Sequence, residues 1–211
     1  MKLFSEDLRD QQAIDPRFAF GRPDGQGKMI LSDNLNPHLA WSEVPATTRS
    51  FALVCIDPDV PASAEQANQE AVTIPHDAPR TDFYHWNMIN IAADSRHIDR
   101  GVCSQGVTVG GKQQPSGPAG TTQGLNDYTR FMAGSGMAGQ YHGYDGPCPP
   151  WNDERLHHYQ FCLYALDIAY LDLAPGFTGP DLMQAIKAHI LDRACLTGTY
   201  TLNPQLRNQP A

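Results

Sequence analysis

The chain has 211 residues and a net charge of −8, with only 15 Lys and Arg, which are scattered along the sequence. Because no basic stripe is present, we expect neither a nucleic acid nor an acidic membrane leaflet as a partner. Pro and Gly number 17 and 18, which favours many turns and short strands over a helix bundle.

Signals for export or membrane insertion are missing from the sequence. Residues 6–10 carry four charges, where a secretory signal would need an apolar run of about 7 to 15 residues. No stretch reaches the roughly 20 apolar residues that a spanning helix needs. We therefore expect a cytoplasmic protein with no membrane insertion.

The cysteines form an odd set without a CxxC pair: Cys55, Cys103, Cys148, Cys162 and Cys195. This spacing indicates neither a disulfide framework nor a zinc knuckle. A chain of this length also buries enough surface to fold without disulfides. We therefore expect most of the cysteines to be buried thiols.

Three short apolar runs predict buried strands, at residues 50–56, 85–91 and 157–166. Between the second and third runs, residues 101–146 hold twelve of the eighteen glycines. That composition predicts a long loop, which residues 126–128 and Phe131 could anchor. Loops of this length are usually functional or disordered.

A helix is expected after Thr178, which is an N-cap residue with Asp181 at the third helical position. Positions at helical spacing follow at Leu182, Ile186, His189, Ile190 and Arg193. The polar connectors at 10–26 and 62–80 do not separate segments that could each bury a core. The sequence therefore predicts a mainly β fold in a single domain over residues 1–211.

Two sets of polar residues lie at the ends of predicted strands, one directly after the first strand and one at the start of the second. Asp57 and Asp59 stand in the pattern Asp-Pro-Asp-Val-Pro, whose two prolines stiffen the backbone and hold both carboxylates at a rim. Ordinary turn chemistry also explains this pattern. His85 opens the second strand beside Phe83 and Tyr84, which suggests a walled cleft, although a histidine at a strand end often has a purely structural role.

A third polar group lies in residues 144–159, where a proline-rich loop leads into the last strand. Because strand side chains alternate, His157 and Tyr159 share one face and His158 points to the other. Gly146 has no Cβ, so we expect its amide to approach a ligand and donate to an anion. Imidazole, phenol and amide donors that face a carboxylate predict an anion site.

No GxSxG or HExxH motif and no facial triad of metal ligands is present in the sequence. We therefore expect no catalytic residue, no metal and no cofactor. A metal site made of His85, His157 and Asp57 stays open as a less favoured alternative.

Longer blocks of sequence carry a family resemblance. ALVCIDPDVP, FYHWNMINI and GYDGPCPPWNDERLHHYQFCLYALD, at 52–61, 83–91 and 143–167, resemble the phosphatidylethanolamine-binding protein family, most closely its bacterial YbhB/YbcL, Raf-kinase-inhibitor-like branch. NLNPHLAWSEVP, GLNDYTRF and LTGTYTLNP, at 34–45, 124–131 and 196–204, extend the match over nearly the whole chain.

The resemblance implies an antiparallel β-sandwich with C-terminal helical segments beside it and a shallow pocket for phosphate-type anions. It assigns the ligand-binding residues Asp57, Pro61, His85, Gly146, Pro147, Pro149, His157 and Tyr159, with Pro150 as a further wall residue. His158 replaces the family's usual Arg, and binding should survive because this side chain points away from the pocket. The Val60–Pro61 peptide is a candidate for the cis form, as in relatives.

We therefore expect a non-enzymatic binding protein for phosphate or another small anionic head group, with a kinase or protease as a further partner. One alternative is a hydrolase or lyase that uses Asp57 as base and His85 or His157 as acid. Another is a protein-interaction scaffold with a vestigial pocket. A homodimer agrees with the resemblance and with the general frequency of two-fold assemblies.

Overall fold

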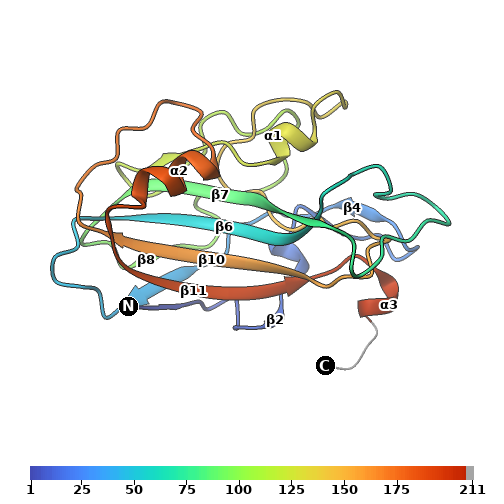
Figure 1. Ribbon diagram of the computed structural model, residues 1–211, viewed down its shortest axis with the longest axis horizontal. Helices are drawn as coiled ribbons and strands as arrows, with labels where there is room; N and C mark the ends of the chain where they lie inside the picture. The colour runs from blue at the N-terminus through green and yellow to red at the C-terminus, as the bar shows by residue number, and fades with distance from the viewer. Residues whose placement is uncertain (208–211) are drawn as a thin grey trace.

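A six-stranded sheet forms the centre of the computed structural model, which describes residues 1–207 (Figure 1). All neighbouring strands in it are antiparallel except the first two. Their order is β2 (Gln12–Ala13), β11 (Ile190–Tyr200), β10 (His157–Leu166), β6 (Ser50–Pro61), β7 (Arg80–Ala92) and β9 (Thr122–Gln123).

Two further layers cover the central sheet. A three-stranded sheet packs on one face, where Trp41 lies 5.5 Å from Phe51 between ring centres. The helix α2 (Gly179–Ile186) packs on the other face through Leu182 and Ile186. The order in the smaller sheet is β1 (Lys2–Phe4), β5 (Leu39–Ser42) and β8 (His97–Ile98). The predicted mainly β sandwich with helical segments beside it is confirmed.

The remaining elements are short and connect these layers. They are the hairpin of β3 (Gly21–Pro23) and β4 (Met29–Leu31), the 3-10 helix η1 (Pro16–Phe18), and the helices α1 (Tyr128–Phe131) and α3 (Pro204–Arg207). No helix in residues 1–207 has both the length and the apolar character that crossing a membrane requires.

The strand β6 is buried on both faces, as its uninterrupted apolar sequence predicts. Phe51 and Leu53 belong to the core between the two sheets, and Ala52 and Val54 belong to the core beneath α2. The other two predicted strands are confirmed as β7 and β10. Both β6 and β7 extend further than predicted, to Pro61 and from Arg80 respectively, and these extensions carry part of the candidate site.

The helix α2 is shorter than the apolar spacing of its sequence predicts. A capping box between Thr178 and Asp181 begins it as expected. The helix ends at Ile186, however, and Ile190 begins β11, which pairs with β10 along its whole length. Pairing with a neighbouring strand therefore overrides a local helical pattern.

Two of the cysteines form a disulfide, which their spacing in the sequence did not indicate. Cys162 in β10 and Cys195 in β11 stand opposite each other and are bonded. Their approach depends on β11, whose first residues the sequence placed at helical spacing. The other three, Cys55, Cys103 and Cys148, are free. Because disulfides persist mainly in oxidising compartments, the cytoplasmic location stays a prediction.

The segment 101–146 contains only β9 and α1 as regular elements, in agreement with the predicted long loop. Asn126 donates to Asp145 Oδ2 at 2.8 Å, Asp127 accepts from the backbone N–H of Tyr84 at 2.8 Å, and Tyr128 is buried. These three residues anchor the loop as expected. Phe131 stays 48 % exposed and contributes less to the anchor.

The Val60–Pro61 peptide is trans, as are all peptide bonds within residues 1–207. The resemblance made this bond a candidate for the cis form, and the structure has it in the trans form. The register between β6 and β7 shifts between Asp57 and Val60, so the strand accommodates the prolines through an irregularity in pairing.

Candidate functional site

Four side chains that the sequence singled out meet at one end of three neighbouring strands. Asp57 comes from β6, His85 from β7, and His157 and Tyr159 from β10. Each is at most 3 % exposed, and all four line one pocket with a cavity volume of about 130 Å³. We call these four residues the polar floor.

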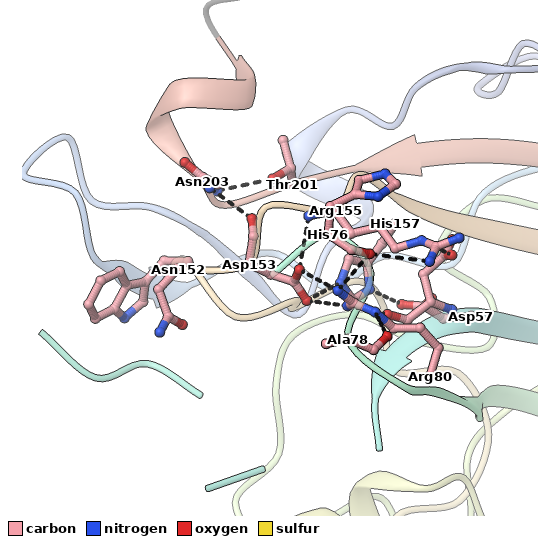
Figure 2. Close-up of polar contacts among 12 residues, drawn as sticks. Asp57, His76, Ala78, Arg80, Asn152, Asp153, Arg155, His157, Thr201 and Asn203 are labelled. Atoms are coloured by element: carbon pink, nitrogen blue, oxygen red, sulfur yellow. Dashed lines mark hydrogen bonds and ion pairs between the residues drawn. The ribbon is translucent and has the colours of Figure 1, made fainter. Parts of the chain in front are cut away.

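A buried chain of charges continues from Asp57 and His157 of the polar floor to Asp153 and Arg80 (Figure 2). His157 Nδ1 lies 2.7 Å from Asp57 Oδ2, and His157 Nε2 lies 3.2 Å from Asp153 Oδ2. Arg80 donates to both carboxylate oxygens of Asp153, at 2.6 and 3.0 Å, and also to nearby backbone carbonyl groups. Both ring nitrogens of His157 therefore face carboxylates, which favours the doubly protonated imidazolium.

The two carboxylates set the charge of His157. Burial by itself would lower the pKa of this imidazole, but the charge of Asp57 and hydrogen bonds with Asp153 and Asp57 raise the pKa to about 9. Burial likewise acts to raise the pKa of Asp57, and the positive charge of His157 brings it below the usual value. Asp57 and His157 are therefore an ion pair at neutral pH.

His85 has a different partner and a different charge. Its Nδ1 lies 2.8 Å from the backbone carbonyl oxygen of Asp145, and its ring packs against Phe83 and Tyr159 at 4.7 and 5.1 Å. Burial lowers the pKa of His85 and outweighs the opposing charge of Asp57. Because a carbonyl oxygen only accepts, Nδ1 carries the proton of the neutral ring, and Nε2 is an acceptor.

Tyr159 supplies a phenol next to the Asp57 carboxylate. Burial raises the pKa of Tyr159 well above its usual value, and the charge of Asp57 raises it further. The hydroxyl therefore stays protonated and can donate a hydrogen bond.

The remaining walls of the pocket are mainly apolar. Phe20, Phe83 and Tyr128 form an aromatic wall, in which Phe20 and Tyr128 stack at 4.4 Å and Phe83 meets Tyr128 edge-on at 5.2 Å. Leu31 and Phe131 line the pocket while 46 % and 48 % exposed, so they form its outer rim. The pocket thus leads from an apolar rim to a buried polar floor.

Gly146 does not offer the free amide that the sequence predicts. Its N–H donates to Asn34 Oδ1 at 2.8 Å. A Cβ at this position would lie 2.0 Å from the carbonyl oxygen of Phe18, so the glycine is required for close packing of the loop. Its lack of a side chain therefore has a structural reason, and the expected donor role is corrected.

The prolines of the predicted site divide into two groups. Pro149 and Pro150 line the pocket, as the resemblance implies for wall residues, and Pro61 lines it as well. Pro147 lies outside the lining, and its carbonyl oxygen accepts from the backbone N–H groups of Phe20 and Gly21 at 2.9 and 3.2 Å. Its role is therefore to hold the loop against the neighbouring hairpin.

His158 points away from the pocket, as strand alternation predicts. Its Nδ1 lies 2.8 Å from Asp59 Oδ2, and Arg155 Nε lies 2.8 Å from the other oxygen of the same carboxylate. The His158 side chain is 39 % exposed, whereas the neighbouring His157 is fully buried. Asp59 therefore pairs with His158 and Arg155 outside the pocket lining.

Sequence reasoning missed Arg80, Asp153 and Tyr128 as parts of the site. Asp153 precedes His157 by four residues within a recognised block, which is a local signal that could have been used. Arg80 follows a long polar connector and offers no such signal. Tyr128 was expected only as an anchor of the loop, and it lines the pocket because that loop folds over the end of β7.

Comparisons with known proteins agree with this architecture. A family model described as phosphatidylethanolamine-binding protein matches residues 4–201. The UPF0098 protein YbhB of Escherichia coli strain K12 is 31 % identical over 201 residues, which cover 95 % of this chain and 100 % of that protein. A UPF0098 protein of Methanothermobacter thermautotrophicus is 34 % identical over 168 residues, which cover 80 % of this chain and 83 % of the relative.

A solved structure shows the same fold. The crystal structure of E. coli YbcL, described as a member of the mammalian PEBP family, matches with a TM-score of 0.67 and 24 % identity, covering 95 % of this chain and 97 % of YbcL. With a family model that spans almost the whole sequence, this chain belongs to the phosphatidylethanolamine-binding protein family.

Proposed function

We propose that this protein binds a small ligand through a phosphate-type or other anionic head group and does not catalyse a reaction on it. The observation that carries this proposal is the polar floor, four polar residues at the buried end of one otherwise apolar pocket. Small-molecule sites commonly combine apolar walls with a few placed polar groups that orient the ligand.

The apolar walls support a ligand that carries an apolar group next to its head group. Leu31 and Phe131 expose nearly half of their surface at the rim, and Phe83 and Tyr128 continue the wall inward. An aromatic ring on the ligand would remove apolar surface from water on both sides of the contact. Phenyl phosphate joins both chemistries, and inorganic phosphate represents the head group alone.

Calorimetric titration at pH 6.0 tests the proposal. Phenyl phosphate should bind at least about 10-fold more tightly than inorganic phosphate, because burying a ring of this size contributes about 1.5–3 kcal/mol. Tyr159→Phe removes only a hydroxyl and should weaken phenyl phosphate binding about 10-fold, the effect of losing one hydrogen bond to a charged group.

His158→Gln is the matched control, because this side chain neighbours His157 but points to the opposite face of β10. It should bind both ligands as the wild type does. Binding at the polar floor would be contradicted if phenyl phosphate bound the wild type and Tyr159→Phe with equal affinity, or if its titration gave only the heat of dilution.

Phenyl phosphate also tests the hydrolase alternative, with the wild type and an Asp57→Asn variant. This alternative predicts release of phenol from phenyl phosphate that stops in Asp57→Asn, whereas the binding proposal predicts no phenol release. A kinase or protease partner and a homodimer stay predictions. Sedimentation analysis of the purified protein tests the dimer.

A further inference from the structure

The pocket lacks the positive charge that a fully ionised anion needs. Among the described residues that line it there is no Lys or Arg, and its charged groups are Asp57 and His157. These two charges face each other at 2.7 Å. The positive charge of His157 is further shared with Asp153, so no cation is left unpaired for a ligand.

Most hydrogen-bond donors of the site are also in use. Both ring nitrogens of His157 face carboxylates, the Gly146 amide donates to Asn34, and the wall prolines have no N–H. Ser63 and Asn68 line the pocket only at its exposed rim. The Tyr159 hydroxyl is therefore the main donor of the polar floor, and because it also hydrogen-bonds with Asp57, that carboxylate competes with a ligand for it.

Acceptors, in contrast, are available at the polar floor. His85 Nε2 makes no hydrogen bond with any residue from 1 to 207, and it can accept one because the proton of this ring is on Nδ1 beside the carbonyl oxygen of Asp145. Asp57 Oδ1 accepts from the backbone N–H of Asp59 and Asp57 Oδ2 from His157, and each oxygen has capacity for a further donor. The floor is thus better suited to receive hydrogen bonds than to give them.

We infer, building on the proposed function, that the polar floor binds the protonated form of its head group. An acidic O–H of a phosphate monoester monoanion donates to Asp57 or His85 Nε2, and the remaining charged oxygens accept from Tyr159. A dianion would place two negative charges beside the Asp57 carboxylate in an apolar pocket, with no acid proton to donate.

The pKa values of the groups around the polar floor determine whether a change of binding with pH comes from the ligand or from the protein. From β6 comes Asp57, whose pKa lies below its usual value, and from β7 comes His85, whose pKa burial lowers. From β10 come His157, with a pKa of about 9, and Tyr159, with a pKa well above its usual value.

Other groups face the floor from the loops that pack on it. Burial raises the pKa of Tyr128 well above its usual value and that of Cys148 to about 12. The ion pairs of Lys112 with Asp145 and of Arg80 with Asp153 lie behind the lining. Asp57 and His157 therefore keep their charges from pH 5.5 to 7.5.

The test compares phenyl phosphate with phenyl sulfate at pH 5.5 and pH 7.5. Because the second ionisation of such phosphate esters has a pKa near 6, the fraction of phenyl phosphate present as the protonated monoanion falls about 25-fold from pH 5.5 to pH 7.5. Phenyl sulfate carries one negative charge and no acid proton at either pH, and it also reports any change in the charge of His85. Calorimetry on wild-type protein measures both ligands.

We expect the affinity for phenyl phosphate to fall about 25-fold from pH 5.5 to 7.5. Phenyl sulfate should bind at least about 10-fold more weakly than phenyl phosphate at pH 5.5, because it offers no hydrogen-bond donor. Its affinity should change less than about 2-fold between the two pH values. Asp57→Asn, which removes the repelling charge at similar shape, should shrink the pH response to phenyl phosphate to less than about 5-fold. His158→Gln should keep the full response.

Equal affinities and equal pH responses for the two ligands would overturn the inference and leave the proposed anion binding intact. Binding of neither ligand at pH 5.5 would instead refute the proposed function itself. If Asp57→Asn does not fold, which its thermal melt would show, the comparison of ligands on wild-type protein still decides.

Discussion

His157 makes the stability of the fold depend on pH on the alkaline side of neutrality. The pKa of this imidazole is about 9 in the folded chain against the ordinary 6.5. A group whose pKa is higher in the folded chain than in the unfolded chain stabilises the fold. This stabilisation is complete below the pKa of the unfolded chain and is lost as the pH rises through the pKa of the folded chain. The displacement corresponds to about 3 kcal/mol, which should be lost from the free energy of unfolding between pH 6.5 and 9.

Other groups whose pKa is displaced act at the two ends of this window. Burial lowers the pKa of His85 below 6.5, so this group costs stability towards pH 6, where the unfolded chain binds its proton. Burial also raises the pKa of Cys103 and of Cys148 to about 12, so these thiols ionise first in the unfolded chain and cost stability near pH 9. Because these groups are the same in a His157→Gln variant, the difference in stability between wild type and variant reports the buried imidazolium.

Urea unfolding at pH 6.0, 7.5 and 9.0 measures the effect, with fluorescence of the buried Trp41 and Trp86 as the signal. The His158→Gln control should lose the same free energy as the wild type. His157→Gln should be less stable than the wild type, because two carboxylates lose their shared cation, and this deficit should shrink by about 3 kcal/mol from pH 6.0 to 9.0. A deficit that stays constant to within about 0.5 kcal/mol over this range would refute the reasoning.

Three further predictions concern the surroundings of the site. Arg80→Met leaves the buried Asp153 carboxylate without its bidentate partner and should lower the free energy of unfolding in urea by about 3–5 kcal/mol. Gly146→Ala places a Cβ 2.0 Å from a backbone carbonyl oxygen, so the variant should lose its cooperative thermal melt or melt well below the wild type. Reduction of Cys162–Cys195 opens a loop with a sequence separation of 33 and should reduce stability in urea by about 3–4 kcal/mol.

Each of these predictions has a control within the chain. Gly136→Ala introduces a Cβ with nothing within 4 Å and should melt as the wild type does, whereas equal melting of Gly146→Ala would contradict the packing argument. Thiol counting in denaturant without reductant should find three free cysteines, and five would contradict the disulfide. An Arg80→Met variant as stable as the wild type would mean that water or another group replaces the lost cation.

Much of the fold followed from local patterns in the sequence. The uninterrupted apolar run at 50–56 predicted a strand buried on both faces, and β6 alternates its side chains between two cores. Thr178 and Asp181 predicted the start of α2. The end of that helix was not predictable in this way, because β11 exists through its hydrogen bonds with β10, and the opposing positions of Cys162 and Cys195 depend on the same pairing.

The sequence by itself singled out Asp57, His85, His157 and Tyr159, because each stands near the end of a predicted strand within a recognisable block. Only the tertiary structure decided how their charges and protons are arranged. Arg80 and Asp153 fix the charge of His157, and the Asp145 carbonyl oxygen fixes the proton of His85, through contacts between segments distant in the chain. Gly146 likewise looked like a ligand donor until the fold placed Asn34 against its amide. The residue type determines whether a group can donate or accept a hydrogen bond. Which partner it bonds with depends on the groups that the fold brings next to it.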